Sequence, residues 1–185
     1  MIKDKLRILM YILDGRLKIH KDKDSKINID GLRLMGDAQI DIKCTNGSSI
    51  YIGRGTMIFG KRVNIEANDI SIIHIGHGCQ IHSDVNITAR KKIKIGNECL
   101  MAKYVYILDS DHAIKEGVIQ PNKFIEKEVF IGDNVWIGTK ATILKGSLIP
   151  NYCVVGANSL INKEFNTFYT LIAGTPAIEK KHNNI

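Results

Sequence analysis

The segment from Ile131 to Lys163 repeats with a period of six residues, and this repeat limits the fold more than any other feature of the chain. Large aliphatic residues recur at one position of each hexapeptide: Ile131, Ile137, Ile143, Ile149, Val155 and Ile161. Four places later comes a second, mostly small set: Val135, Ala141, Ser147, Cys153 and Ser159. An amphipathic helix spaces its apolar residues three and four apart, and a lone strand alternates by twos. The period of six therefore indicates a chain that turns a corner every six residues.

Such a repeat predicts a solenoid in which each hexapeptide supplies a short strand and a corner. The aliphatic residue fills the interior, and each rung buries its apolar face only against its neighbours, so the rungs must stack. Gly and Asn, as at Gly156 and Asn158, tolerate the tight corners. Before Asn64 the repeat is loose, which is typical of terminal repeats.

The length of 185 residues fits one domain with three unequal parts. We expect an N-terminal helix and link at 1–26, the solenoid at 27–178, and a basic tail at 179–185. Residues 113–128 lack the sixfold pattern and contain Gly117 and Pro121, so we expect a protruding loop there.

The helix expected at 3–13 has apolar residues at i, i+3, i+4 and i+7, namely Leu6, Leu9, Met10 and Leu13. We expect it to cap the first coil. A role at a membrane surface is the alternative, and Lys3, Lys5 and Arg7 support it. The charged run from His20 to Lys26 is interpreted as a turn and solvated link.

Lys and Arg exceed Asp and Glu by 26 − 19 = 7. This balance permits a phosphorylated small molecule or an anionic surface as partner, and we expect no nucleic acid. Four cysteines, Cys44, Cys79, Cys99 and Cys153, lack metal-binding spacing, and the last three occupy the small position of their repeats. They are interpreted as buried side chains of a cytoplasmic protein, since the chain has no apolar run of roughly 18 residues and no signal peptide.

The phrases IGDNVWIG, VVGANSLINK and AGTPA together resemble the hexapeptide-repeat acyltransferases over about residues 50–178. That resemblance implies an all-β fold, a left-handed parallel β-helix with three short strands per coil. It implies an enzyme that takes acetyl-CoA as acyl donor, as the galactoside, maltose and serine acetyltransferases do. For such an acetyltransferase we expect no metal.

His112 is the candidate general base, because it stands in the motif LDSDHAI at the root of the expected loop. We place it at the last corner before the loop, with Asp109 and Asp111 beside it to orient the ring or contact the acceptor. Imidazole titrates near neutral pH, so it can accept a hydroxyl proton as that oxygen attacks a thioester. In the resembling enzymes a histidine just ahead of such a loop has this role.

The donor site follows from stacking, since residues 18 apart lie one above the other if three hexapeptides make a coil. Thr139 then lies below Ala157, about 4.8 Å away. The resemblance implies that backbone amides at these positions contact CoA, near Trp136 and Gly138, and that the Thr139 amide can face the thioester oxygen. It also puts Asn162 and Lys163 near the nucleotide end of CoA, where Lys180 and Lys181 add positive charge.

The acceptor side departs from the resembling family. Asn86 matches an acceptor-contacting asparagine of the sugar acetyltransferases, but Arg90 and Lys91 replace an acidic residue expected soon after it. Phe124 stands where those enzymes have a glutamate, with Glu126 and Glu128 as nearby substitutes, and Ile178 replaces a basic residue after the G-x-P-A turn.

Several functions stay open from the sequence. The first is acetylation of a saccharide hydroxyl in surface polysaccharide synthesis, and the second is N-acetylation of a nucleotide-linked amino sugar. The histidines at His74, His77 and His82 also allow a zinc carbonic-anhydrase-like enzyme of the same fold, and a purely structural solenoid is a further alternative. For an acetyltransferase we expect a homotrimer, because His112 and Thr139 fall on different corners of a coil.

Overall fold

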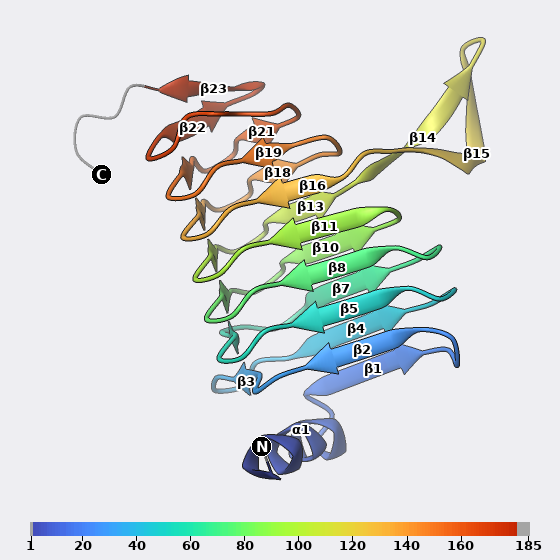
Figure 1. Ribbon diagram of the computed structural model, residues 1–185, viewed down its shortest axis with the longest axis vertical. Helices are drawn as coiled ribbons and strands as arrows, with labels where there is room; N and C mark the ends of the chain where they lie inside the picture. The colour runs from blue at the N-terminus through green and yellow to red at the C-terminus, as the bar shows by residue number, and fades with distance from the viewer. Residues whose placement is uncertain (1, 181–185) are drawn as a thin grey trace.

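The computed structural model describes residues 2–180. They form a three-sided parallel β-solenoid with one helix, α1 (Ile2–Leu13), at its base (Figure 1). Strands in the front layer of Figure 1 run leftward and those behind run rightward while the chain rises, so the coil is left-handed. The predicted all-β left-handed parallel β-helix is confirmed.

Each side of the solenoid is one sheet. The first sheet contains β1 (Leu17–Lys21), β4 (Ile40–Cys44), β7 (Val63–Ala67), β10 (Asn86–Ala89), β13 (Tyr106–Leu108), β18 (Thr142–Ile143) and β21 (Leu160–Ile161). The second contains β2 (Lys26–Ile29), β5 (Ser49–Ile52), β8 (Ile72–Ile75), β11 (Lys92–Ile95), β16 (Val129–Ile131) and β19 (Leu148–Ile149). The third contains β3 (Arg33–Leu34), β6 (Met57–Ile58), β9 (Gln80–Ile81), β12 (Leu100–Met101), β17 (Trp136–Ile137), β20 (Val154–Val155), β22 (Leu171–Gly174) and β23 (Ala177–Lys180).

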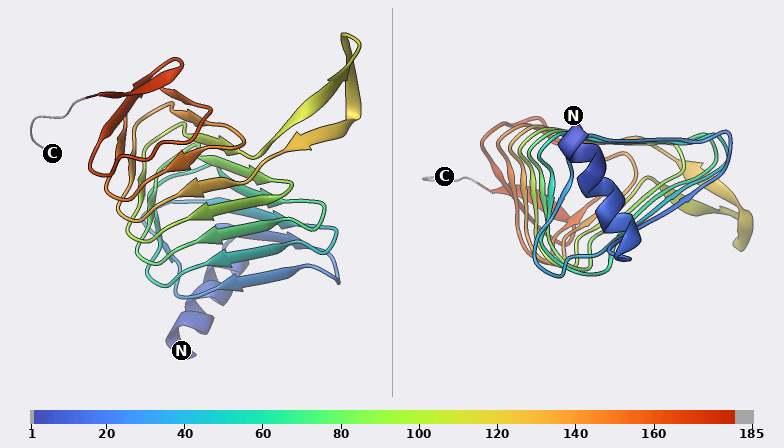
Figure 2. Two further views of the ribbon diagram at one scale, coloured as in Figure 1. Left: turned by 45° about the horizontal axis from the view of Figure 1, so that its top comes forward. Right: turned by 90° about the horizontal axis from the view of Figure 1, so that it is seen from below.

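Three corners join the sheets, and we number them in chain order. The first corner joins the first sheet to the second, the second corner joins the second to the third, and the third corner returns the chain to the first sheet. An antiparallel hairpin of β14 (Ser110–Lys115) and β15 (Val118–Glu126) leaves the first corner and projects from the solenoid (Figures 1 and 2).

The spacing of stacked residues explains why the repeat is clear only late in the sequence. Thr142 pairs with Leu160, 18 residues on, which is three hexapeptides. Leu17 instead pairs with Ile40, 23 residues on, because the early coils carry extra residues at their corners. The step across the hairpin, from Tyr106 to Thr142, is 36 residues. The hairpin is therefore an insertion into an otherwise continuous stack.

The interior is a set of aliphatic columns. In the first sheet one column includes five consecutive isoleucines in register: Ile65, Ile87, Ile107, Ile143 and Ile161. All five are fully buried. The four cysteines are free thiols and buried, as predicted. Burial raises the pKa of the Cys153 thiol, which favours the uncharged form and suits a small apolar filler.

The segment expected to be a link belongs to the solenoid. His20 lies in β1, which pairs in parallel with β4, and Lys26 begins β2. The charged side chains of β1 suggested a solvated turn in the sequence. In the structure they lie on the outer face of the strand, while Leu17 fills the interior. On that outer face His20 Nε2 lies 3.4 Å from the Asp41 carboxylate. At the other end, Glu179 and Lys180 lie in β23, and residues 181–185 of the expected tail fall outside the described residues.

Helix α1 covers the base of the solenoid, but not with the predicted face. Tyr11 is buried and Ile8 packs against the core, whereas the apolar stripe identified in the sequence points away from it. That stripe is exposed at Leu6, Leu9, Met10 and Leu13. Within the described residues, α1 is the only helix, and it is neither long nor apolar enough to cross a bilayer.

The isoleucine column makes a stability prediction. Replacing Ile107 by Ala leaves a cavity between Ile87 and Ile143, so we expect the free energy of unfolding to fall by about 2–5 kcal/mol. Denaturant unfolding measures the change. Ile119→Ala in the hairpin, where the side chain is exposed, is the control and should change stability by less than about 0.5 kcal/mol. Equal losses in both variants would contradict the stacked core.

Candidate active site

His112 lies within a strand, not at the predicted corner. It is an exposed residue of β14, directly opposite Phe124 of β15, with a register shift between His112 and Ala113. The expected irregular loop at 113–128 is thus an ordered hairpin that begins at Ser110. Its turn residues Glu116 and Gly117 both have positive φ, 51° and 80°, as a two-residue type I′ turn requires. The signal in the sequence was Glu116-Gly117 between two short apolar runs.

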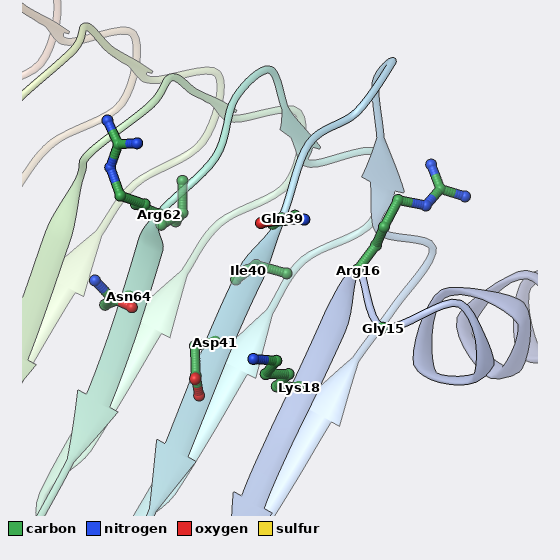
Figure 3. A pocket seen from close by; sticks show the side chains of 9 residues that line it. Gly15, Arg16, Lys18, Gln39, Ile40, Asp41, Arg62 and Asn64 are labelled. Carbon is green, nitrogen blue, oxygen red and sulfur yellow. The ribbon is translucent and has the colours of Figure 1, made fainter.

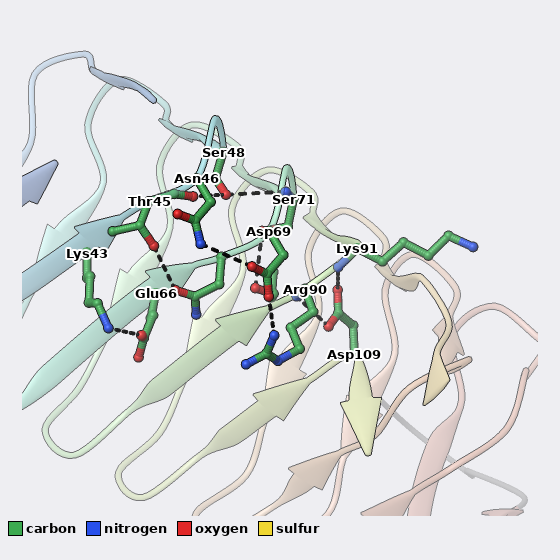
Figure 4. A network of polar contacts seen from close by, with 12 residues as sticks. Lys43, Thr45, Asn46, Ser48, Glu66, Asp69, Ser71, Arg90, Lys91 and Asp109 are labelled. Carbon is green, nitrogen blue, oxygen red and sulfur yellow. Dashed lines mark hydrogen bonds and ion pairs between the residues drawn. The ribbon is translucent and has the colours of Figure 1, made fainter. Parts of the chain in front are cut away.

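The ring of His112 is positioned by an aromatic neighbour. The Phe124 ring lies 4.7 Å from it, centroid to centroid, at an interplanar angle of 37°. The guanidinium carbon of Arg90 lies 3.5 Å from the Phe124 centroid, a cation–π contact. Arg90 also pairs with the Asp69 carboxylate (Figure 4). Phe124 and Arg90, which departed from the family pattern in the sequence, are the residues that support the candidate base.

Asp109 has a structural task that the sequence did not reveal. Its carboxylate is fully buried and accepts hydrogen bonds from the backbone N–H groups of Arg90, Lys91 and Lys92, at 2.8, 2.8 and 2.7 Å (Figure 4). Its own carbonyl accepts from the Lys127 N–H at 2.9 Å. Asp109 therefore ties both ends of the hairpin to the coil below. Among the described hydrogen bonds the Asp109 carboxylate contacts only this corner, so the structure shows no direct bond to His112, and its expected role in orienting the ring stays a prediction.

Asp111 lies in β14 and is half-exposed, with its carboxylate paired to the Lys145 ammonium. Lys145 belongs to the first corner of the next coil. This ion pair links the hairpin to the coil above, as Asp109 links it to the coil below. Asp109 and Asp111 thus both attach β14, the strand that contains His112, to the solenoid.

The stacking of Thr139 and Ala157 that the spacing predicts is present at the third corner, and we call this pair of residues the ridge. Ile137 pairs with Val155 and Thr142 with Leu160, so the corners between them, at Thr139 and Ala157, are stacked. The Asn158 N–H donates to the Thr139 carbonyl at 2.9 Å. A Cβ on Gly138 would lie only 2.7 Å from the Ala157 nitrogen, so glycine permits this close approach.

The two amides of this ridge are available to a ligand. Among the hydrogen bonds of residues 2–180, the N–H groups of Thr139 and Ala157 donate to no protein acceptor. Trp136, two residues before Gly138, is 53% exposed on the third sheet. An exposed aromatic face beside a ladder of free N–H donors can hold an extended ligand with carbonyl or amide groups.

Other residues expected at the donor site lie elsewhere in one chain. Asn162 and Lys163 follow β21 at the first corner, where the Lys163 ammonium lies 5.3 Å from the Phe165 ring centroid. Lys180 is in β23, opposite Leu171. The structure does not bring them to the Thr139 ridge within one chain. Lys181 falls outside the described residues.

Asn86 starts β10 at the third-corner end of the first sheet, away from the hairpin. Its side-chain oxygen Oδ1 accepts a hydrogen bond from Asn64 Nδ2 at 2.9 Å. Its side-chain nitrogen Nδ2 donates to the backbone carbonyl of Asp84 at 3.3 Å. Within one chain it is therefore separated from His112 by the length of the strand.

The structure does not gather the histidines proposed for zinc. His74 stacks on Tyr51 on the second sheet, with ring centroids 4.7 Å apart, and burial together with the Lys94 ammonium lowers its pKa. His77 at the second corner pairs with Glu98 at 3.2 Å, and His82 stacks on Phe59 beside the third sheet. Residues 2–180 hold no cluster of three metal-ligating side chains.

A family of known proteins and individual relatives match this sequence. The family described as "Bacterial transferase hexapeptide (six repeats)" matches residues 128–163. The chain is 32% identical to WbbJ of Escherichia coli (strain K12), named for O-acetyl transfer in lipopolysaccharide biosynthesis, over 75% of each protein. It is 29% identical to the polysialic acid O-acetyltransferase of Neisseria meningitidis, covering 66% of this chain and 67% of that one. The chain therefore belongs to the hexapeptide-repeat acyltransferase family, and within it to the acetyltransferases.

One similar solved structure is a variant of AntD, an N-acyltransferase from Bacillus cereus, in complex with dTDP-4-amino-4,6-dideoxyglucose and coenzyme A. The TM-score is 0.59 at 14% identity, with 97% of this chain and 89% of that one covered. At this identity the likeness concerns the fold alone.

The contacts of Asp109 and Asp111 lead us to expect different losses of stability when each carboxylate is removed. Asp109→Ala leaves three corner N–H groups without their acceptor, so the free energy of unfolding should fall by roughly 2–4 kcal/mol. Asp111→Ala removes one exposed ion pair and should cost less than about 1 kcal/mol. Chemical denaturation measures both. If the two variants lost the same stability, the anchoring role of Asp109 would be excluded.

Proposed function

We propose that the protein transfers an acetyl group from acetyl-CoA to a hydroxyl of a saccharide or sugar nucleotide in surface polysaccharide synthesis. The observation that carries this proposal is that one chain presents both an exposed His112, whose ring contacts Phe124, and a ridge of free amides at Thr139 and Ala157. The names of the two O-acetyltransferases described above support a saccharide acceptor. Four free, buried thiols fit the reducing cytoplasm, where we place the reaction.

In the proposed reaction His112 accepts the proton of the acceptor hydroxyl as that oxygen attacks the thioester carbonyl. The negative charge that develops on the carbonyl oxygen is stabilised by the Thr139 N–H. Collapse of the tetrahedral intermediate breaks the carbon–sulfur bond, and the imidazolium returns its proton to the leaving thiolate. Base catalysis of this kind needs no covalent enzyme intermediate.

The two halves of the site belong to different subunits in this proposal. The hairpin leaves the first corner, whereas Thr139 and Ala157 lie at the third corner. From Lys140 to Lys145, five residues of extended chain span roughly 16 Å of the first sheet. A homotrimer with cyclic symmetry brings the first corner of one chain beside the third corner of its neighbour. The hairpin projects from the solenoid at the first corner (Figure 2), and in the proposed trimer it extends toward the neighbour's ridge.

The reaction itself is tested by incubating the protein with labelled acetyl-CoA and a panel of sugars and amino-sugar nucleotides. We expect a labelled product that alkali hydrolyses, as an ester does. An alkali-stable product made only from amino sugars would instead show N-acetyl transfer.

Loss of the base should affect turnover and not binding. For His112→Ala we expect kcat to fall by about 10²–10⁴-fold, with acetyl-CoA affinity nearly unchanged. His77→Ala is the matched control, since His77 is an exposed histidine at another corner. If activity survived in His112→Ala but was lost in His77→Ala, His77 at the second corner would be the base and not His112.

The amide ridge is tested by removing one N–H. Thr139→Pro deletes the donor and should raise the Kd for acetyl-CoA and lower kcat, whereas Thr139→Ala keeps the N–H and should behave like wild type. Calorimetric titration and initial rates give the two constants, with circular dichroism to verify folding. Equal damage in both variants would assign the effect to the hydroxyl side chain.

A further inference from the structure

Helix α1 presents an apolar face that the solenoid does not cover. It is anchored from its other side by Tyr11, whose hydroxyl oxygen accepts a hydrogen bond from the Leu34 N–H at 3.2 Å, and by Ile8. The opposite side carries four exposed apolar side chains, which are Leu6 at 56%, Leu9 at 51%, Met10 at 63% and Leu13 at 78%. Their positions at i, i+3, i+4 and i+7 place them on one stripe of the helix. Figure 2 shows α1 lying across the base of the solenoid.

Positive charge is concentrated at the same end of the molecule. Residues 1–26 contain eight Lys or Arg and four Asp, so 8 − 4 = 4 of the net charge of +7 lies in this short segment. Lys5 is exposed on α1, and Lys18, Lys21 and Lys23 are exposed just after it. The apolar stripe therefore lies next to basic residues.

A shallow hollow beside the end of α1 adds to this charge. It has a volume of about 180 Å³ and opens on the outer face of the first sheet, next to Gly15 (Figure 3). The cationic side chains that line it are Arg16, Lys18 and Arg62, and Asp41 is the one carboxylate among its lining residues. Arg16 also pairs with Asp14 and Arg62 with Asp84, whereas Lys18 is exposed and forms no ion pair among the described residues.

We propose that α1 docks the protein on an anionic phospholipid surface. The stripe from Leu6 to Leu13 enters the boundary between headgroups and acyl chains, and the basic residues around it face the phosphates. An apolar face flanked by cations is the pattern of helices that lie in a membrane interface. A second copy is a poorer occupant, because two bases meeting end to end bring together like charges of about +4 each.

Docking in this way leaves the candidate active site accessible. The base with α1 and the projecting hairpin lie at different heights along the solenoid (Figure 1). In the proposed trimer, cyclic symmetry puts all three α1 helices at the same end, so three weak contacts act together. Membrane binding would therefore hold the hairpin above the surface.

Vesicle co-sedimentation with the full-length protein tests the proposal. We compare vesicles of phosphatidylcholine alone with vesicles that contain about 30% phosphatidylglycerol, an anionic lipid. We expect binding to the anionic vesicles, and binding should weaken when NaCl is raised to about 0.5 M, since salt screens the cations. The double variant Leu9→Gln with Leu13→Gln should bind at least about tenfold more weakly, because it loses apolar contact without touching the Tyr11 anchor.

A matched control removes apolar surface elsewhere. Ile114→Gln with Ile119→Gln changes two side chains of the hairpin that are 65% and 62% exposed, and it should bind vesicles like wild type. The proposal is overturned if wild type fails to bind anionic vesicles, or if the Leu9 and Leu13 variant binds as well as wild type. A smaller oligomer in the Leu9 and Leu13 variant, measured by light scattering, with no lipid binding in wild type, would identify a second copy as the occupant instead.

Discussion

In-register parallel stacking is the constraint on which every other feature of this structure depends. Each coil pairs residue for residue with its neighbours, and the buried column from Ile65 to Ile161 keeps that register, because a slip of one residue would turn each isoleucine outward. The stacked sheets then fix the three corners as straight edges of a prism. Groups that lie at one corner of successive coils are held a strand spacing apart without needing contacts of their own.

The candidate active site uses two of these edges in different ways. At the third corner the stack itself makes the site, because Thr139 and Ala157 are aligned by the strands on either side of them. At the first corner the hairpin interrupts the stack. There the buried Asp109 carboxylate accepts hydrogen bonds from three backbone N–H groups of the coil below. The hairpin that carries His112 is thus a projection with a rigid root. Phe124 and Arg90 extend this rigidity to the imidazole ring.

The sequence predicted what depends on the repeat and missed what interrupts it. The solenoid, the buried cysteines and the alignment of Thr139 with Ala157 all follow from a period of six residues, and the structure confirms them. The hairpin strands were missed because their side chains are mostly exposed, so they lack the alternation that marks a half-buried strand. The role of Asp109 was missed because a buried carboxylate and a solvated one look alike in a sequence. The outward face of α1 was missed because an apolar stripe does not reveal whether it packs on its own chain.

The central claim is that the base and the amide ridge come from neighbouring subunits, and complementation tests it most directly. Two inactive variants, His112→Ala and Thr139→Pro, are unfolded and refolded together in equal amounts, and acetyl transfer is measured on the mixture. In randomly assembled trimers with shared sites, about a quarter of the sites combine an intact His112 with an intact Thr139, so activity should return to about a quarter of wild type. If each site lay within one chain, every site would carry one defect and the mixture would stay inactive, which would contradict the account.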